Sequence, residues 1–212
     1  MDNVKSSPGG SAKLSVKLTN DADIVSGTFS ITLPEGVVPA TNADGTIQIK
    51  TTSRVPADMT LVGNVAANGE CRFAIMPGSG SIKSGDGTLF SITLRPDASM
   101  ELDDYDIILD DTKLVTSDLL RVQPFQTTAT LTLKEPESGD VNGDGETDIL
   151  DATYIVYRYL GRPTNVFYED AGDVNGDGET DILDATIIVY RYLGRSVGAN
   201  ASVRKKFELD PQ

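Results

Sequence analysis

The chain has 212 residues, which is enough for one large domain or for two small domains with cores of their own. Its net charge of -14 argues against nucleic acid and anionic membranes as partners, because both reward Lys and Arg. The chain has no histidine, so the commonest general base and the commonest transition-metal ligand are missing. The composition does not exclude sites that bind hard cations through oxygen ligands.

The single cysteine and the hydropathy of the chain further limit the class of protein. The single cysteine, Cys71, lies in an alternating apolar run and is expected to be a buried thiol. No stretch approaches the roughly 20 apolar residues of a membrane-spanning helix, so no membrane span is expected.

Charge and composition divide the chain near Lys134. Residues 1–134 carry 16 acidic and 11 basic residues, whereas residues 135–212 carry 16 acidic and 7 basic residues. We expect one domain over 1–134, a short linker over 135–138, a second domain over 139–195, and a C-terminal tail over 196–212.

Residues 1–134 are predicted to be all β. Apolar residues alternate with polar ones at period 2 in several short runs, and Gly, Pro and Asn-Gly or Asp-Gly turn signals separate these runs. Many short strands with one apolar face each indicate a two-sheet β-sandwich of jelly-roll type. The predicted strands contain Leu14–Leu18, Phe29–Leu33, Ile47–Ile49, Cys71–Ile75, Phe90–Leu94, Tyr105–Leu109 and Ala129–Leu133.

Residues 139–195 contain an internal repeat with a period of 33 residues. The first copy, residues 139–162, reads GDVNGDGETDILDATYIVYRYLGR, and the second copy covers residues 172–195. The two blocks differ at one position only, which is Tyr154 in the first copy and Ile187 in the second.

Each copy opens with acids at the spacing of a 12-residue calcium loop. Calcium takes six to eight oxygen ligands, and loop positions 1, 3, 5, 7, 9 and 12 supply them, with a backbone carbonyl at position 7 and a glycine turn at position 6. The glycines are Gly145 and Gly178. The predicted ligands are Asp140, Asn142, Asp144, Glu146 (carbonyl), Asp148 and Asp151 in the first loop, and Asp173, Asn175, Asp177, Glu179 (carbonyl), Asp181 and Asp184 in the second.

Two other interpretations of these loops stay open. An acidic turn cluster could form without metal, and magnesium could replace calcium, although a cage supplied entirely by protein suits calcium better. Because each loop gathers four Asp side chains in a small module, we expect this module to be partly or wholly unfolded without calcium.

Two copies of DVNGDGxxDxxDA, each followed by one helix and ending in Tyr-Leu, resemble a type I dockerin over residues 139–195. The resemblance implies paired F-hand motifs, two bound Ca²⁺ ions, and a cohesin-type module as partner in a cellulosome-like or cell-surface glycan-degrading assembly. Position 8 departs from the family pattern because it is Thr147 or Thr180 instead of Ile or Val. We expect this change to loosen the loop packing.

The helices predict both a core and an outer face. At helical spacing, Ala152, Ile155, Val156, Tyr159 and Leu160, with Ile149 ahead of them, are expected to form the module core, as are their copies. On the other side, Leu, Tyr and Arg together are typical of an interface. The outer set is Leu150, Tyr154, Tyr157 and Arg158, with Leu183, Ile187, Tyr190 and Arg191 as its copies.

In the resembled family, four helix and loop positions per copy determine which partner is bound, and two of them already belong to the outer set. They correspond here to Ile149, Leu150, Val156 and Tyr157, and to Ile182, Leu183, Val189 and Tyr190. The alternative is that these side chains only pack the helices against each other or against the sandwich. Near-identity of the copies also suggests that either helix can bind the same partner, with the complex turned by about 180° between two modes.

The N-terminal sandwich resembles a cohesin module, at the level of pattern. The resemblance rests on the opening strand over 10–20, on the strand and turn over 27–37, and on the strand over 87–94. The alternatives are another immunoglobulin-like sandwich or a carbohydrate-binding module. The second is weakened because the chain has no Trp, and Phe29, Phe73, Phe90 and Tyr105 lie at alternating, core-like positions.

The leading interpretation is a non-catalytic scaffold or interaction protein whose cohesin-type partner is bound in trans or in cis. A carbohydrate-binding module carried by a dockerin is the alternative. An enzyme is not expected, because histidine is absent and the best carboxylates are assigned to calcium. Extracellular calcium fills even weak sites, so we expect a secreted or surface-attached bacterial protein, although no apolar signal segment follows Met1.

Overall fold

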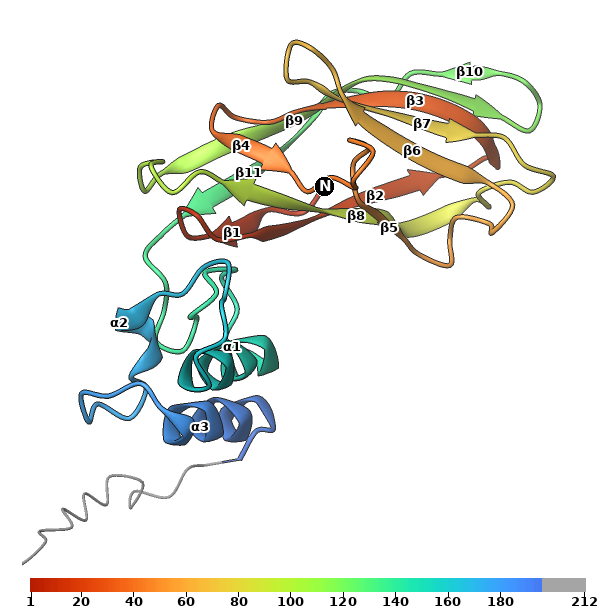
Figure 1. Ribbon diagram of the computed structural model, residues 1–212. Helices are drawn as coiled ribbons and strands as arrows, with labels where there is room; N and C mark the ends of the chain where they lie inside the picture. The colour runs from red at the N-terminus through yellow and green to blue at the C-terminus, as the bar shows by residue number, and fades with distance from the viewer. Residues whose placement is uncertain (196–212) are drawn as a thin grey trace, which may run out of the picture. The chain divides into compact units, whose positions relative to one another are not determined.

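A computed structural model describes residues 1–195 (Figure 1). The chain divides into two compact units, Met1–Glu135 and a second unit that begins at Pro136. The predicted tail over 196–212 lies outside the described residues.

The first unit is a sandwich of two β-sheets, as predicted, and Figure 1 shows the sheets face to face. Neighbouring strands are antiparallel except for one parallel pair at the edge of the larger sheet. The larger sheet runs β1 (Val4–Ser6), β11 (Thr127–Leu133), β9 (Asp104–Thr116), β3 (Ile24–Thr32), β7 (Cys71–Met76) and β6 (Thr60–Val65), and β10 (Arg121–Val122) also pairs with β9. The smaller sheet runs β2 (Ala12–Asn20), β8 (Gly85–Pro96) and β4 (Val37–Pro39), and β5 (Ile49–Thr51) also pairs with β8.

The core of the sandwich lies between the two sheets and contains the inward-facing residues of the predicted alternating runs. Phe29 and Phe73 stack with ring centroids 5.0 Å apart, and Phe90 tilts against both rings. Cys71 is fully buried, and burial raises the pKa of its thiol to about 11. These aromatic side chains are therefore core residues and leave no stacking surface for sugars at their positions.

Strand β6 was not predicted, and its inward-facing glycine explains why. A Cβ on Gly63 would lie 2.7 Å from the ring of Phe73. The Phe73 ring from β7 occupies the space beside Gly63. An apolar side chain at this position would have given the alternating pattern of a strand. Strands β1, β4 and β10 are three residues long or shorter, which is too short for an alternation signal. Ile47, predicted within a strand, makes only an isolated bridge to Thr41.

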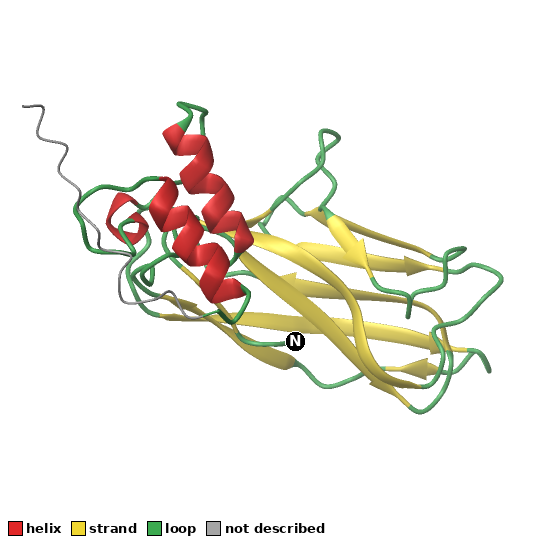
Figure 2. Cartoon of the chain, turned by 90° about the horizontal axis from the view of Figure 1, so that it is seen from below, coloured by secondary structure: helices red, strands yellow, loops and turns green. Residues whose placement is uncertain are grey.

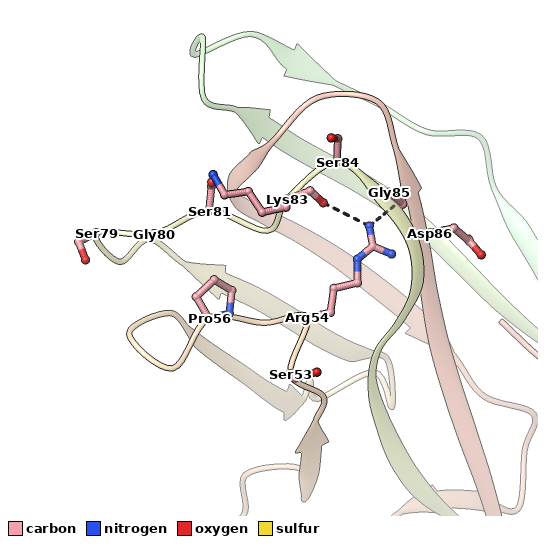
Figure 3. Close-up of a pocket in the computed structure, with 10 residues that line it drawn as sticks. All are labelled: Ser53, Arg54, Pro56, Ser79, Gly80, Ser81, Lys83, Ser84, Gly85 and Asp86. Atoms are coloured by element: carbon pink, nitrogen blue, oxygen red, sulfur yellow. Dashed lines mark hydrogen bonds between the residues drawn. The ribbon is translucent and has the colours of Figure 1, made fainter.

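Arg54 links the end of β2 to the start of β8 in the smaller sheet. Its guanidinium donates to the carbonyl oxygens of Leu18 (2.5 Å), Gly85 (2.6 Å) and Gly87 (3.2 Å), and to Asn20 Oδ1. Figure 3 shows the side chain reaching across a shallow hollow to the carbonyls of residues 83 and 85. These donors satisfy carbonyls at the strand ends, so Arg54 has a structural role that the sequence did not indicate.

The second unit contains α1 (Ile149–Tyr159), the short α2 (Glu169–Gly172) and α3 (Ile182–Tyr192). The two longer helices lie side by side, as both views show (Figures 1 and 2). Their core is small and consists of Val141, Ala152, Ile155, Ala171, Ala185 and Ile188. Glycines with φ of 67° and 65°, Gly161 and Gly194, end the two helices as expected.

Part of the predicted core of this unit is wrong. Tyr159 and Leu160 are 62% and 58% exposed, and Ile149 is 42% exposed. Their copies Ile182, Tyr192 and Leu193 are exposed as well. These residues lie at the first and last turns of helices of only 11 residues. The buried positions of α1 are Asp151, Ala152 and Ile155, which the rest of the unit covers, whereas it does not cover these exposed residues.

Candidate calcium loops and helix faces

The first loop wraps around its own acidic side chains. Asp140 accepts hydrogen bonds from the backbone N–H groups of Asp144 (3.1 Å to Oδ1) and Gly145 (3.0 Å to Oδ2). Asp151, twelve residues into the loop, accepts from the N–H groups of Asn142 (3.2 Å) and Asp148 (2.8 Å). The first and last acids therefore hold the loop closed from both ends.

The second loop repeats this geometry. Asp173 accepts from the N–H groups of Asp177 (3.1 Å) and Gly178 (2.8 Å). Asp184 accepts from the N–H groups of Asn175 (3.2 Å) and Asp181 (2.9 Å). Identical sequences thus fold into closely similar loops.

Glycine at position 6 permits the turn that both loops need. Gly145 and Gly178 have φ of 84° and 88°, a left-handed conformation that disfavours residues with a Cβ. The glycine turns expected at these positions are confirmed.

Each loop leads directly into a helix through a reciprocal cap. The side chain of Asp148 accepts from Leu150 N–H at 2.7 Å, and Asp151 accepts from the N–H of Asp148. Asp181 and Asp184 form the same capping box at the start of α3. Loop closure and helix initiation therefore use the same carboxylates.

Three of the loop carboxylates are buried. Asp151 and Asp184 are 0% exposed and Asp140 is 1% exposed. Burial, with further effects of the Asp140 and Asp144 charges, raises the pKa of Asp151 from 3.8 to about 7. Burial likewise raises the pKa values of Asp140, Asp144 and Asp184. The metal-free loops therefore hold carboxylates in surroundings that disfavour their charge.

The donor set suits a hard cation. All the side chains assigned as ligands offer oxygen, and a divalent cation would offset the charge of the buried acids. Within residues 1–195, no three His, Cys, Asp or Glu side chains already converge as a complete metal site. The carboxylates accept hydrogen bonds from backbone N–H groups of the loops instead. The twelve ligand positions stay a prediction.

The threonines at position 8 pack more closely than expected. A Cβ on Gly139 would lie 2.7 Å from Cγ2 of Thr147, and a Cβ on Gly172 would lie 2.5 Å from Cγ2 of Thr180. Each threonine methyl thus fills the space beside the glycine that begins its own repeat.

Four residues per copy form an exposed helix face. Leu150 and Leu183 are each 51% exposed, and Tyr157 and Tyr190 are 39% and 41% exposed. We call these sets the α1 face (Ile149, Leu150, Tyr157 and Arg158) and the α3 face (Ile182, Leu183, Tyr190 and Arg191). The two faces have the same residues and nearly the same exposure.

Four other residues assigned to the partner face are wholly or partly buried. Ile187 is only 6% exposed, so its assignment is wrong. Tyr154, Val156 and Val189 are half-buried and pack against the core of the second unit. The side-by-side packing of α1 and α3 covers these positions, which helical spacing alone could not show.

The comparisons with known proteins follow the same division. The Dockerin type I domain model matches residues 138–194. No curated protein matches the chain. Within residues 1–195, no helix has the length and the hydropathy required to cross a bilayer.

The sandwich is similar in fold to cohesins. It matches a non-cellulosomal cohesin from the archaeon Archaeoglobus fulgidus at 16% identity and a TM-score of 0.51, covering 63% of this chain and 88% of that chain. It matches the sixth cohesin of scaffoldin B from Acetivibrio cellulolyticus, solved with a Cel5 dockerin, at 17% identity and a TM-score of 0.51, covering 63% and 95%. It also matches the type I cohesin–dockerin complex Coh-OlpA-Doc918 from Clostridium thermocellum at 18% identity and a TM-score of 0.50, covering 63% and 95%. The chain thus joins an N-terminal β-sandwich of cohesin-like fold to a C-terminal dockerin region with helices.

Proposed function

We propose that this chain is a non-catalytic, calcium-binding interaction protein whose dockerin region binds a cohesin-type module. The observation that carries the proposal is the pair of matching α1 and α3 faces, each directly after a loop with a calcium ligand pattern. One Ca²⁺ ion per loop gives two ions in all.

Calcium would couple to partner binding through the helix starts. Asp151 and Asp184 are the last ligands of their loops and also the third residues of α1 and α3. An ion that holds these carboxylates therefore also holds the first turn of each helix. Removing calcium is expected to disorder both faces together and abolish binding.

The faces have the composition of a binding surface. Leu, Tyr and Arg exposed on one side of a helix supply apolar area, a ring and a guanidinium, which are the groups that contribute most to protein interfaces. The sandwich, by its cohesin-like fold, is proposed as a second interaction module, which binds a dockerin in trans or in cis. We place the protein in a secreted or cell-surface assembly for polysaccharide degradation.

Equality of the faces leads to two binding modes. The same partner surface can bind the α1 face or the α3 face, with the complex turned by about 180°. The one sequence difference between the copies, Tyr154 against Ile187, lies outside the two faces, which carry the same four residue types although their arginines make different contacts.

Calorimetry with type I cohesin modules, and separately with residues 1–134 of this chain, tests the proposal. With calcium, Leu150→Ala with Tyr157→Ala should weaken binding only about twofold, because one of two equal modes remains. Leu183→Ala with Tyr190→Ala is the matched counterpart and should behave alike. All four changes together should weaken binding more than about 100-fold.

Two results would contradict the proposal. Binding that persists in excess chelator would exclude the calcium-held faces as the binding surface. A loss of binding from one face alone would exclude two equal modes while leaving a single-mode dockerin.

A further inference from the structure

The two calcium loops have the same sequence but different surroundings. In the first loop Asp140, Val141 and Gly143 are buried, whereas the corresponding Asp173 and Val174 are half-buried and Gly176 is exposed. The difference must come from outside the loops, since the repeated blocks are identical there.

The segment between the repeats covers the first loop. A Cβ on Gly143, whose φ is 70°, would collide with the ring of Tyr168. Backbone hydrogen bonds join this segment to the first repeat. They run from Tyr168 N–H to the Val141 carbonyl (3.0 Å) and from Gly139 N–H to the Ala171 carbonyl (2.7 Å). We call Phe167, Tyr168 and Glu169 the cover.

Helix α1 anchors the cover from the other side. The Arg158 guanidinium pairs with Glu169 and lies 5.4 Å from the centre of the Phe167 ring. The matching arginine in α3, Arg191, donates instead to the Val174 carbonyl of its own repeat at 3.3 Å. The cover is therefore held to the first repeat by both backbone and side-chain contacts.

The second loop has no such cover among the described residues. Apart from the glycine and its two chain neighbours, no residue within 1–195 has a heavy atom within 4 Å of a Cβ built on Gly176. The positions 33 residues after the cover are Asn200, Ala201 and Ser202, so the sequence does not repeat its two rings or its acid.

We propose that the cover makes the two calcium sites kinetically unequal, so that the ion in the second loop leaves first. The inference rests on the proposed binding of one ion per loop. Release from the first loop requires the Tyr168 ring to move aside, whereas no residue within 1–195 covers the second loop in this way. Because the second loop starts α3, calcium withdrawal disorders the α3 face before the α1 face. Tyr168 is a positioning residue and supplies no ligand.

Stopped-flow mixing of the calcium-loaded full chain with the fluorescent chelator Quin-2 tests this order. Wild type should release its ions in two phases of equal amplitude, with rates that differ by about tenfold, the factor that 1.4 kcal/mol of extra opening free energy gives. Asp173→Ala should leave the slow phase and Asp140→Ala the fast phase. Tyr168→Ala should bring the slow phase close to the fast one.

The controls separate the cover from general damage. Tyr168→Phe keeps the ring and should keep both rates, and Tyr159→Ala removes an exposed tyrosine of α1 and should also keep both. If Tyr168→Ala fails to fold, Glu169→Gln loosens the anchor without touching the loop and should accelerate the slow phase, whereas Asp170→Asn should not.

Three outcomes overturn the inference: a single release phase in wild type, a slow phase that belongs to the second loop, or a slow phase that neither Tyr168→Ala nor Glu169→Gln accelerates. Each of these leaves two bound ions and the proposed function in place. Calorimetry that finds no bound calcium would overturn the proposed function itself.

Discussion

Asp151 and Asp184 are single residues that each serve three structural roles. Each is a fully buried carboxylate, each closes a loop, and each caps a helix. Burial disfavours their negative charge, and neighbouring loop acids add to the cost at Asp151. A bound cation reverses this balance, since it stabilises the charged form of the same carboxylates.

The stability of the metal-free second unit should therefore depend on pH. The folded-state pKa of Asp151, about 7, lies above its ordinary value of 3.8, so the folded state binds protons more tightly than the unfolded state. Stability should increase as pH falls from about 7 to about 4 and be lost as pH rises again, by at most about 4 kcal/mol.

Circular dichroism of the full chain in chelator, followed at the helical band between pH 4 and pH 8, measures this effect. Helical signal should be regained toward low pH. Asp151→Asn should reduce the dependence, because the amide does not titrate, and the raised pKa values of Asp140, Asp144 and Asp184 account for what remains. A helical signal that decreases toward pH 4 would contradict the assignment of Asp151 as a buried, charge-disfavouring position.

At the scale of elements, α1 and α3 show how a near-exact repeat can diverge without changing its surface. The one differing side chain is half-buried as Tyr154 and 6% exposed as Ile187. The helices therefore use this position to fit their neighbours, while the exposed faces keep the same leucine, tyrosine and arginine.

Exchanging the two residues tests this packing. Ile187→Tyr replaces a buried isoleucine with a larger, aromatic side chain and should destabilise the calcium-loaded unit by about 1–3 kcal/mol. Tyr154→Ile makes the repeats identical and should cost less than about 1.5 kcal/mol. Urea denaturation with calcium gives both values. Partner affinity should stay unchanged in each folded variant, and a loss of affinity in Tyr154→Ile would return that residue to the partner face.

At the scale of the whole molecule, the two units differ in what stabilises them. The sandwich has an extended apolar core between two sheets, whereas the second unit has a core of six buried residues, three of which are alanines. A core this small is expected to need the proposed ions for stability, whereas the larger core of the sandwich is expected to suffice on its own.

Calorimetric unfolding of the full chain should show this difference as two transitions. Calcium at 100 times its dissociation constant stabilises a domain by about 2.7 kcal/mol per site, so chelator should lower or remove one transition and leave the other in place. Residues 1–134 alone should reproduce the transition that chelator leaves. A single transition that moves as a whole with calcium would show instead that the two units unfold together.

Much of this architecture follows from the sequence because its signals are local. Alternation at period 2 predicts the longer strands, the 33-residue repeat predicts two loop–helix copies, and the requirement for positive φ predicts Gly145 and Gly178 at the turns. Each signal can be read along the chain, so it does not depend on what packs against the element in the fold.

Features that depend on distant neighbours required the tertiary structure. Strand β6 stayed hidden because its inward position is Gly63, which is filled by a ring from another strand. Helical spacing could not show that Ile187 is covered while Tyr159 is exposed, since both depend on where the other helix lies. The sequence by itself determined two identical loops and two nearly identical helices, and burial in the structure decided which helix residues form the exposed faces. Only the tertiary structure decided that Tyr168 covers one loop, because that contact joins residues 25 positions apart.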